Sequence, residues 1–224
     1  MSNVVFFDGT DDYVDCVPNA GLNITDNLTM EIWFKHKLKT SYGTPGIYAG
    51  LLQKGGRPWM AGGAYGLSYH TGNLNVYAYY RDNTNALYNS VYTGLIDPDK
   101  WYHVVSTFAT GTMKIYVNGN LIQTAAAGFN TLNTNVLDLY IGGLISSYYA
   151  GFISETRIYN VVLSDTDILY NNSHPNNPKR RGLVLNLTQD SIYGPQWNDL
   201  SGNANNGTYV GGAVPVTNNR LAGR

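Results

Sequence analysis

The chain has 224 residues, with 14 basic and 15 acidic side chains and a formal net charge of −1. Only 13% of its residues are charged, against about a quarter in an ordinary globular domain. This balance leaves no surplus of basic residues to displace counterions, so nucleic acid is excluded as the expected partner. No run of residues reaches the roughly 20 apolar residues of a membrane helix, so we expect no membrane insertion.

The composition favours strands over helices. The chain has 26 Asn, 25 Gly and 19 Tyr residues, but only two glutamates, Glu31 and Glu155. Asn and Gly supply turns and Tyr suits strand surfaces, whereas helical proteins are usually rich in Glu and Lys. We therefore predict an all-β sandwich. The single cysteine, Cys16, lies in an apolar run and is predicted to be a packed thiol.

Apolar runs of four to eight residues recur between turn signals, which is typical of a sandwich. The predicted strands cover residues 4–7, 13–17, 28–35, 65–70, 74–80, 101–108, 113–117, 121–124, 137–142, 152–159 and 183–187. In the third run, one face carries apolar residues and the other carries Glu31 and Trp33. The apolar residues are Leu28, Met30, Ile32 and Phe34.

Two local signals are clear. Asn118-Gly119 separates two predicted strands and favours a tight primed turn, which predicts a hairpin. A single helix is predicted over residues 163–171, with Ser164 as its N-cap and two acidic residues in its first turn.

The chain divides into a body (1–171), a linker (172–182) and a C-terminal segment (183–224). The linker is rich in Pro and Asn, and its short basic run is predicted to be solvated. The C-terminal segment has too few apolar residues to bury a core alone, so its strands must pair with the body or with another molecule.

Four motifs follow one another at ordinary spacing: FDGTDDYV (7–14), LTMEIW (28–33), WYHVV with the hairpin (101–105 and 113–119), and GFISETRIYN (151–160). Together they resemble the laminin-G-like domains of the concanavalin A-like lectin and glucanase superfamily. The resemblance implies a jelly-roll β-sandwich of two antiparallel sheets.

The stretch over residues 182–208 resembles one that in this family normally precedes the FDG strand. The resemblance therefore implies a circular permutation, in which the C-terminal strands complete the same sandwich. Alternatively, these strands complete a neighbouring subunit, which would make a homo-oligomer, or they belong to a truncated second repeat.

The sequence predicts no enzyme. Glucanases of the superfamily use paired carboxylates on one strand, but neither Glu31 nor Glu155 has an acidic neighbour two residues away. The four histidines are scattered, and structural roles are favoured for them: His36, His70, His103 and His174.

Asp8, Asp11, Asp12 and Asp15 crowd one turn and supply the hard oxygen ligands that Ca²⁺ prefers. The resemblance also allows Ca²⁺, because several members of the superfamily hold it in loops. The alternative is that Asp8 binds its own turn amides and the others are solvated. No other cofactor is expected.

Binding is the function that the resemblance implies. Sugars are held by aromatic faces and amide side chains, and four loops rich in such residues are candidates: 40–48, 57–65, 79–92 and 146–149. The candidate ligand-binding residues are Trp59, Tyr65, Tyr79, Tyr80, Arg81, Tyr88, Tyr92, Tyr148 and Tyr149. The alternative is that these tyrosines only cover sheet surface.

The first ten residues have no basic segment followed by an apolar one, so no secretory signal is visible and synthesis in the cytoplasm is expected. The implied fold usually works outside cells. A virion surface, tail or decoration protein satisfies both conditions, with glycans or other virion proteins as partners. The alternative is a cellular carbohydrate-binding or adhesion module at the cell exterior.

Overall fold

The computed structural model describes residues 2–17, 20–37, 48–56, 62–143 and 148–218, and it confirms the all-β prediction. The elements are β1 (Ser2–Asp8), β2 (Tyr13–Cys16), the 3-10 turn η1 (Ala20–Leu22), β3 (Leu28–His36), β4 (Tyr48–Lys54), β5 (Tyr65–His70), β6 (Asn75–Arg81), β7 (Tyr88–Tyr92), β8 (Tyr102–Ala109), β9 (Thr112–Val117), β10 (Asn120–Ala126), β11 (Leu139–Ile141), β12 (Ala150–Tyr159), α1 (Asp165–Ser173), β13 (Leu183–Tyr193), β14 (Gln196–Asp199), β15 (Gly207–Val210) and β16 (Val214–Asn218). None of the helices in these ranges is long and apolar enough to span a membrane.

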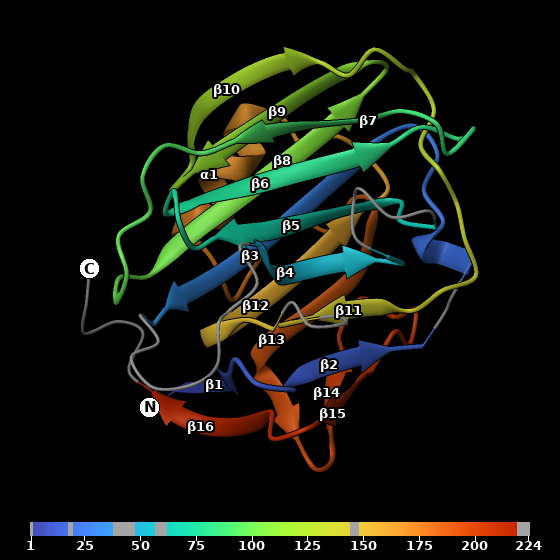
Figure 1. Ribbon diagram of the computed structural model, residues 1–224. Helices are drawn as coiled ribbons and strands as arrows, with labels where there is room; N and C mark the ends of the chain where they lie inside the picture. Colours follow the sequence, from blue (N-terminus) through green and yellow to red (C-terminus); the bar gives the residue numbers. More distant parts are fainter. Residues whose placement is uncertain (1, 18–19, 38–47, 57–61, 144–147, 219–224) are drawn as a thin grey trace.

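The strands pack as two layers (Figure 1). Every pair of hydrogen-bonded strands is antiparallel. The back layer runs β10-β9-β8-β3-β12, and the free edge of β12 then pairs with β1 and with β13. The front layer runs β14-β15-β2-β11-β4-β5-β6-β7. Pairing of β13 with β14 joins the two layers, and α1 lies behind the back layer.

The alternation predicted for β3 is confirmed. Met30, Ile32 and Phe34 lie in the core between the layers, and Phe34 meets Tyr69 of the front layer at 6.3 Å between ring centroids. Glu31 and Trp33 point away from this core, towards α1 and the segment that follows it. This outer face of the back layer is therefore covered as well.

The local turn and helix signals also hold. Asn118 and Gly119 both have positive φ, 50° and 83°, as a primed hairpin turn between β9 and β10 requires. Ser164 caps α1 by accepting a hydrogen bond from the Asp167 amide at 3.2 Å. The helix extends two residues further than predicted, so the first two residues of the predicted linker are helical.

Five strands were not predicted from the sequence: β4, β7, β14, β15 and β16. Strand β4 carries glycine and polar residues among its apolar ones, and β7 (YNSVY) is an edge strand whose side chains are mostly exposed. These strands exist because their backbones pair with neighbours, and a hydrophobic pattern does not report such pairing.

A β-bulge in β12 sets which of its side chains face outwards. Ile153 pairs with Phe34 and Glu155 with Trp33, so Ser154 is the extra residue of the bulge. Ile153 and Ile158, five positions apart, consequently both lie in the core. The same shift places Glu155 and residue 157 on the outer face, beside Glu31 and Trp33.

An ion pair is buried on that outer face. The Arg157 guanidinium donates from Nη1 to Glu31 Oε1 at 3.2 Å, and both side chains are fully buried. Burial alone would raise the pKa of Glu31, but Arg157 and a hydrogen bond with His103 Nε2 at 3.0 Å hold that pKa below its usual value. Burial lowers the pKa of His103, so the imidazole there is neutral. Glu31 is thus a buried carboxylate with a full set of partners.

The network extends to α1 and to the segment after it. Asn171 of α1 donates to Glu31 Oε2 at 3.0 Å, and its own side-chain oxygen accepts from the Lys179 amide at 2.9 Å. Arg157 donates further to the Pro175 carbonyl and, at 2.8 Å, to Asn186 Oδ1 of β13. The predicted linker is therefore docked on the sheet through its backbone.

We expect Arg157→Met to destabilise the protein by about 3–5 kcal/mol, because it leaves the Glu31 carboxylate buried without its cation. Urea unfolding followed by far-UV circular dichroism measures this. The double variant Glu31→Leu/Arg157→Met removes both charges and should lose much less than the sum of the two single variants. Equal, additive losses below 1 kcal/mol would contradict a buried pair.

The C-terminal strands pair with the body of the same chain. Strand β13 lies along β12, β15 along β2 and β16 along β1. Leu185, Leu187 and Trp197 are buried in the core between the layers. The segment thus supplies both strand edges and core side chains.

Deleting residues 183–224 should cause aggregation or unfolding rather than leave a smaller folded domain. The deletion opens the edges of β12 and β2 and removes buried apolar side chains. Size-exclusion chromatography with light scattering and circular dichroism of the truncated chain test this. A soluble, cooperatively unfolding product would show that the body is independent of these strands.

The last strands of the two layers, β7 and β10, lie beside each other at one side of the sandwich (Figure 1). They are joined through side chains. The Tyr92 amide donates to Gln123 Oε1 at 2.8 Å, and Asn89 Nδ2 donates to the Ala126 carbonyl at 3.2 Å. We call this junction the seam.

Candidate functional site

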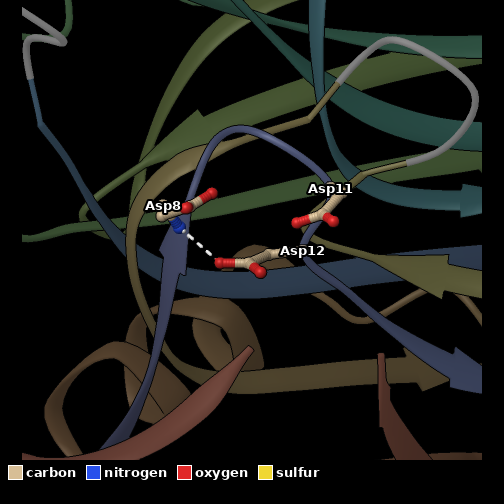
Figure 2. A group of neighbouring side chains, drawn as sticks. All are labelled: Asp8, Asp11 and Asp12. Atoms are coloured by element: carbon tan, nitrogen blue, oxygen red, sulfur yellow. Dashed lines mark hydrogen bonds between the residues drawn. The ribbon is translucent and has the colours of Figure 1, made fainter. Parts of the chain in front are cut away.

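Three of the four predicted metal ligands gather in the turn between β1 and β2. One carboxylate oxygen from each of Asp8, Asp11 and Asp12 lies within 4.8 Å of the others (Figure 2). Asp15 does not join them. It sits within β2, where its backbone pairs with Tyr140 and Thr208.

The oxygens of this acidic turn are largely used by backbone amides. Asp12 is buried and accepts from the Asp8 amide at 2.6 Å and from the Gly212 amide, while Asp8 Oδ1 accepts from the Thr10 amide at 2.6 Å. Burial raises the pKa of Asp12, and the two amides that it binds oppose the increase. The turn therefore ties β1 to the loop before β16, and Ca²⁺ binding stays a prediction.

Four predicted ligand-binding tyrosines are buried: Tyr65, Tyr79, Tyr80 and Tyr149. Tyr65 donates to the Leu22 carbonyl at 2.8 Å, and Tyr80 shares a 2.6 Å hydrogen bond with Ser106 of the opposite layer. Buried rings have no face to offer a ligand. Tyr65, Tyr80 and Tyr149 belong to the core between the layers, and Tyr79 is covered on the outer face of β6. Tyr65, Leu67 and Tyr69 are spaced two residues apart and therefore share one strand face. This spacing is a signal that could have placed Tyr65 inside.

Three of the remaining predicted residues are more open, and Arg81 is buried. Tyr88 and Tyr92 are 53% and 48% exposed, and Tyr148 is half-buried. The Arg81 side chain is buried and donates to the Asn85 carbonyl at 2.7 Å, with its guanidinium 5.8 Å from the centre of the Tyr88 ring. Trp59 lies outside the described residues.

The structure groups Tyr92 with three aromatic residues that the sequence did not single out. Tyr48, His70, Tyr77 and Tyr92 come from the consecutive strands β4, β5, β6 and β7. Ring centroids are 4.6 Å apart for Tyr48 and His70, 5.6 Å for Tyr48 and Tyr77, and 5.5 Å for Tyr77 and Tyr92. We call these four residues the aromatic row.

Strand alternation explains why the row faces outwards. Val76, Ala78 and Tyr80 of β6 lie in the core, so Tyr77 between them points to the other face of the front layer. Register then places Tyr92 opposite Tyr77. With strands about 4.8 Å apart, four rings span roughly 14 Å. This is longer than one sugar ring and suits an extended ligand.

Two glycines make room for buried side chains on the sheet beside the row. A Cβ at Gly66 would lie 2.3 Å from the Tyr79 hydroxyl oxygen, and one at Gly50 would lie 2.5 Å from Gln53 Oε1. The absence of these side chains lets Tyr79 and Gln53 lie against the sheet. In the row itself, burial and the neighbouring Tyr77 and Tyr88 raise the pKa of Tyr48, so its phenol is neutral.

Neither glutamate forms a catalytic pair. Glu31 and Glu155 are both completely buried beneath the outer covering of the back layer. Glu31 is occupied by its partners there, and Glu155 Oε2 accepts from the Ser154 hydroxyl. Glycoside hydrolysis needs two carboxyl groups that flank the substrate, which these positions do not provide.

Comparison with known families identifies the fold. The sequence profile of the concanavalin A-like lectin/glucanases superfamily matches residues 8–169. No curated protein sequence matches the chain.

Solved structures of similar shape include three from different organisms. A candidate carbohydrate-binding protein from Bacteroides ovatus has a TM-score of 0.70 at 19% identity, over 97% of this chain and 60% of that chain. The heptameric SAP-like pentraxin of Limulus polyphemus has a TM-score of 0.57 at 13% identity, over 76% of this chain and 82% of that chain. Domains LG4-5 of the mouse laminin alpha1 chain have a TM-score of 0.52 at 16% identity, over 70% of this chain and 40% of that chain. At such identities the likeness establishes the fold, and this chain spans only 60% of the Bacteroides structure.

Proposed function

The chain belongs to the concanavalin A-like lectin and glucanase superfamily, and from that premise we propose that it is a non-enzymatic, lectin-like module that binds glycans on the aromatic row. The observation that carries this proposal is the row itself. Four aromatic side chains from four adjacent strands lie within contact distance of one another on an outer sheet face. The binding surface thus rests on paired strands, which hold the rings in place.

The chemistry of the row suits a neutral, extended saccharide. Aromatic faces pack against the C–H faces of sugar rings, and phenol hydroxyls exchange hydrogen bonds with sugar hydroxyls. Tyr88, four residues from Tyr92 on the same face of β7, adds a further exposed ring on that strand. The description of the Bacteroides ovatus structure as a candidate carbohydrate-binding protein supports the same ligand class.

We further propose that the module works on the surface, tail or decoration layer of a virion, where glycans or other particle proteins would be its partners. The weak charge and the abundance of Asn, Tyr and Gly support this setting. A cellular carbohydrate-binding or adhesion module at the cell exterior is the alternative. Capsid or tail genes beside the coding sequence would favour the first, and their absence the second.

Replacing Tyr77 or Tyr92 with Ala should weaken glycan binding roughly three- to ten-fold, because each removes one stacking ring. A glycan array identifies the strongest-binding oligosaccharide, and isothermal titration calorimetry then measures its Kd for each variant. Tyr193→Ala is the matched control, since Tyr193 is 62% exposed and lies on β13, outside the row. Wild-type affinity in both row variants would contradict the assignment of the row.

The purified protein should not hydrolyse β-glucans, because both of its glutamates are buried. Reducing-sugar release from barley β-glucan and laminarin measures this, with a commercial glucanase as the positive control. Turnover that is abolished by Glu31→Gln or Glu155→Gln would overturn the non-enzymatic assignment.

A further inference from the structure

A polar concavity lies at the end of the sandwich where β3 begins. It has a volume of about 300 Å³ and is lined by the segment 20–27 and by one residue beyond β12. The lining residues are Ala20, Gly21, Asn23, Ile24, Thr25, Asp26, Asn27 and Asn160. We call it the Asn pocket.

The backbone of the pocket is anchored from beneath. Leu22 and Ile24 are buried in the core, and the Leu22 carbonyl accepts a 2.8 Å hydrogen bond from the buried Tyr65 hydroxyl. The Thr25 carbonyl accepts from the Leu132 amide at 2.7 Å. Alternate residues of the segment are thus fixed in the core, which holds the polar residues between them in place for a ligand.

The functional groups in the pocket are amides and one carboxylate. Asn23, Asn27 and Asn160 offer both N–H donors and carbonyl acceptors, and Asp26 offers acceptors only. The Asn23 side-chain oxygen is buried and has no hydrogen-bond partner among the described residues. A buried acceptor without a partner is costly, so a ligand hydroxyl that donates to it would be favoured.

The pocket is unlike the aromatic row in size and in chemistry. Its volume lies at the lower end of the range for small-molecule sites. Among the described residues that line it there is no aromatic ring and Asp26 is the only charged one, which disfavours anionic ligands. A compact neutral molecule with several hydroxyl groups matches these donors and acceptors.

We propose that the Asn pocket binds a single neutral sugar residue, as a second glycan site separate from the aromatic row. Tyr65, which supports the pocket, and His70, which belongs to the row, are the two ends of β5. The backbones of these two residues are therefore roughly 17 Å apart, and the two sites lie towards opposite ends of the strand. A module with both sites would bind two glycans, or two parts of one, and gain avidity from their combination.

A titration of the ¹⁵N-labelled protein followed by two-dimensional NMR tests the proposal. D-glucose, D-galactose, D-mannose, L-fucose, N-acetylglucosamine and N-acetylgalactosamine are added one at a time, with glycerol as a non-sugar control. At least one sugar should cause saturable shifts in the side-chain amides of Asn23, Asn27 and Asn160. Absence of such shifts with all six sugars, or equal shifts with glycerol, would overturn the proposal.

Variants separate the pocket from the row. Asp26→Ala should raise the Kd of the shifting sugar at least five-fold, whereas Asp190→Ala, at an exposed aspartate outside the pocket, should not change it. Unchanged affinity in Asp26→Ala would contradict the site. The pocket shifts should persist in Tyr77→Ala, so the aromatic row can fail as a glycan site without affecting this result.

Discussion

The buried carboxylate of Glu31 joins parts of the chain that are up to 140 residues apart in sequence. Arg157 lies opposite it on β12, His103 comes from β8, and Asn171 reaches it from α1. A charge in such a position requires all its partners, because each one lost leaves a buried group unsatisfied. Three strands of the back layer and the helix that covers them are consequently fixed relative to one another.

The same network directs the chain into its last strands. Arg157 binds the Pro175 carbonyl and Asn186 of β13, so the connector leaves α1 along a defined path and delivers β13 to the edge of β12. From β13 the chain passes to the front layer through β14 and β15. The strands that carry the aromatic row belong to this layer. The polar cluster behind the back layer thus fixes the start of the segment that joins the two layers.

The sequence predicts those structural features that depend on residues close together in the chain. The Asn118-Gly119 turn, the Ser164 cap and the alternation along β3 follow from rules that operate within a few positions. In the sequence Glu31 is isolated, because its cation, Arg157, is 126 residues away and only strand pairing brings the two together. Distance in sequence, rather than weak chemistry, concealed that interaction.

The candidate site was predicted only in part for a related reason. The sequence predicted a binding surface of loop aromatics, and two of these residues, Tyr88 and Tyr92, are exposed. The row, however, takes one residue from each of four strands, and its members share a face only because of sheet register. Whether a tyrosine is exposed or buried depends on which face of its strand it lies on, and the composition of a loop or strand does not reveal that face.

The seam has a consequence for the way in which copies of the protein meet. An end strand normally presents a row of unpaired amides and carbonyls, which invites another chain to add a strand. At the seam, Gln123 and Asn89 occupy backbone groups of the opposite edge. An amide side chain satisfies the hydrogen bond of such a group but offers no strand backbone with which a further strand could pair. These two side chains therefore make the seam itself a poor template for a further strand.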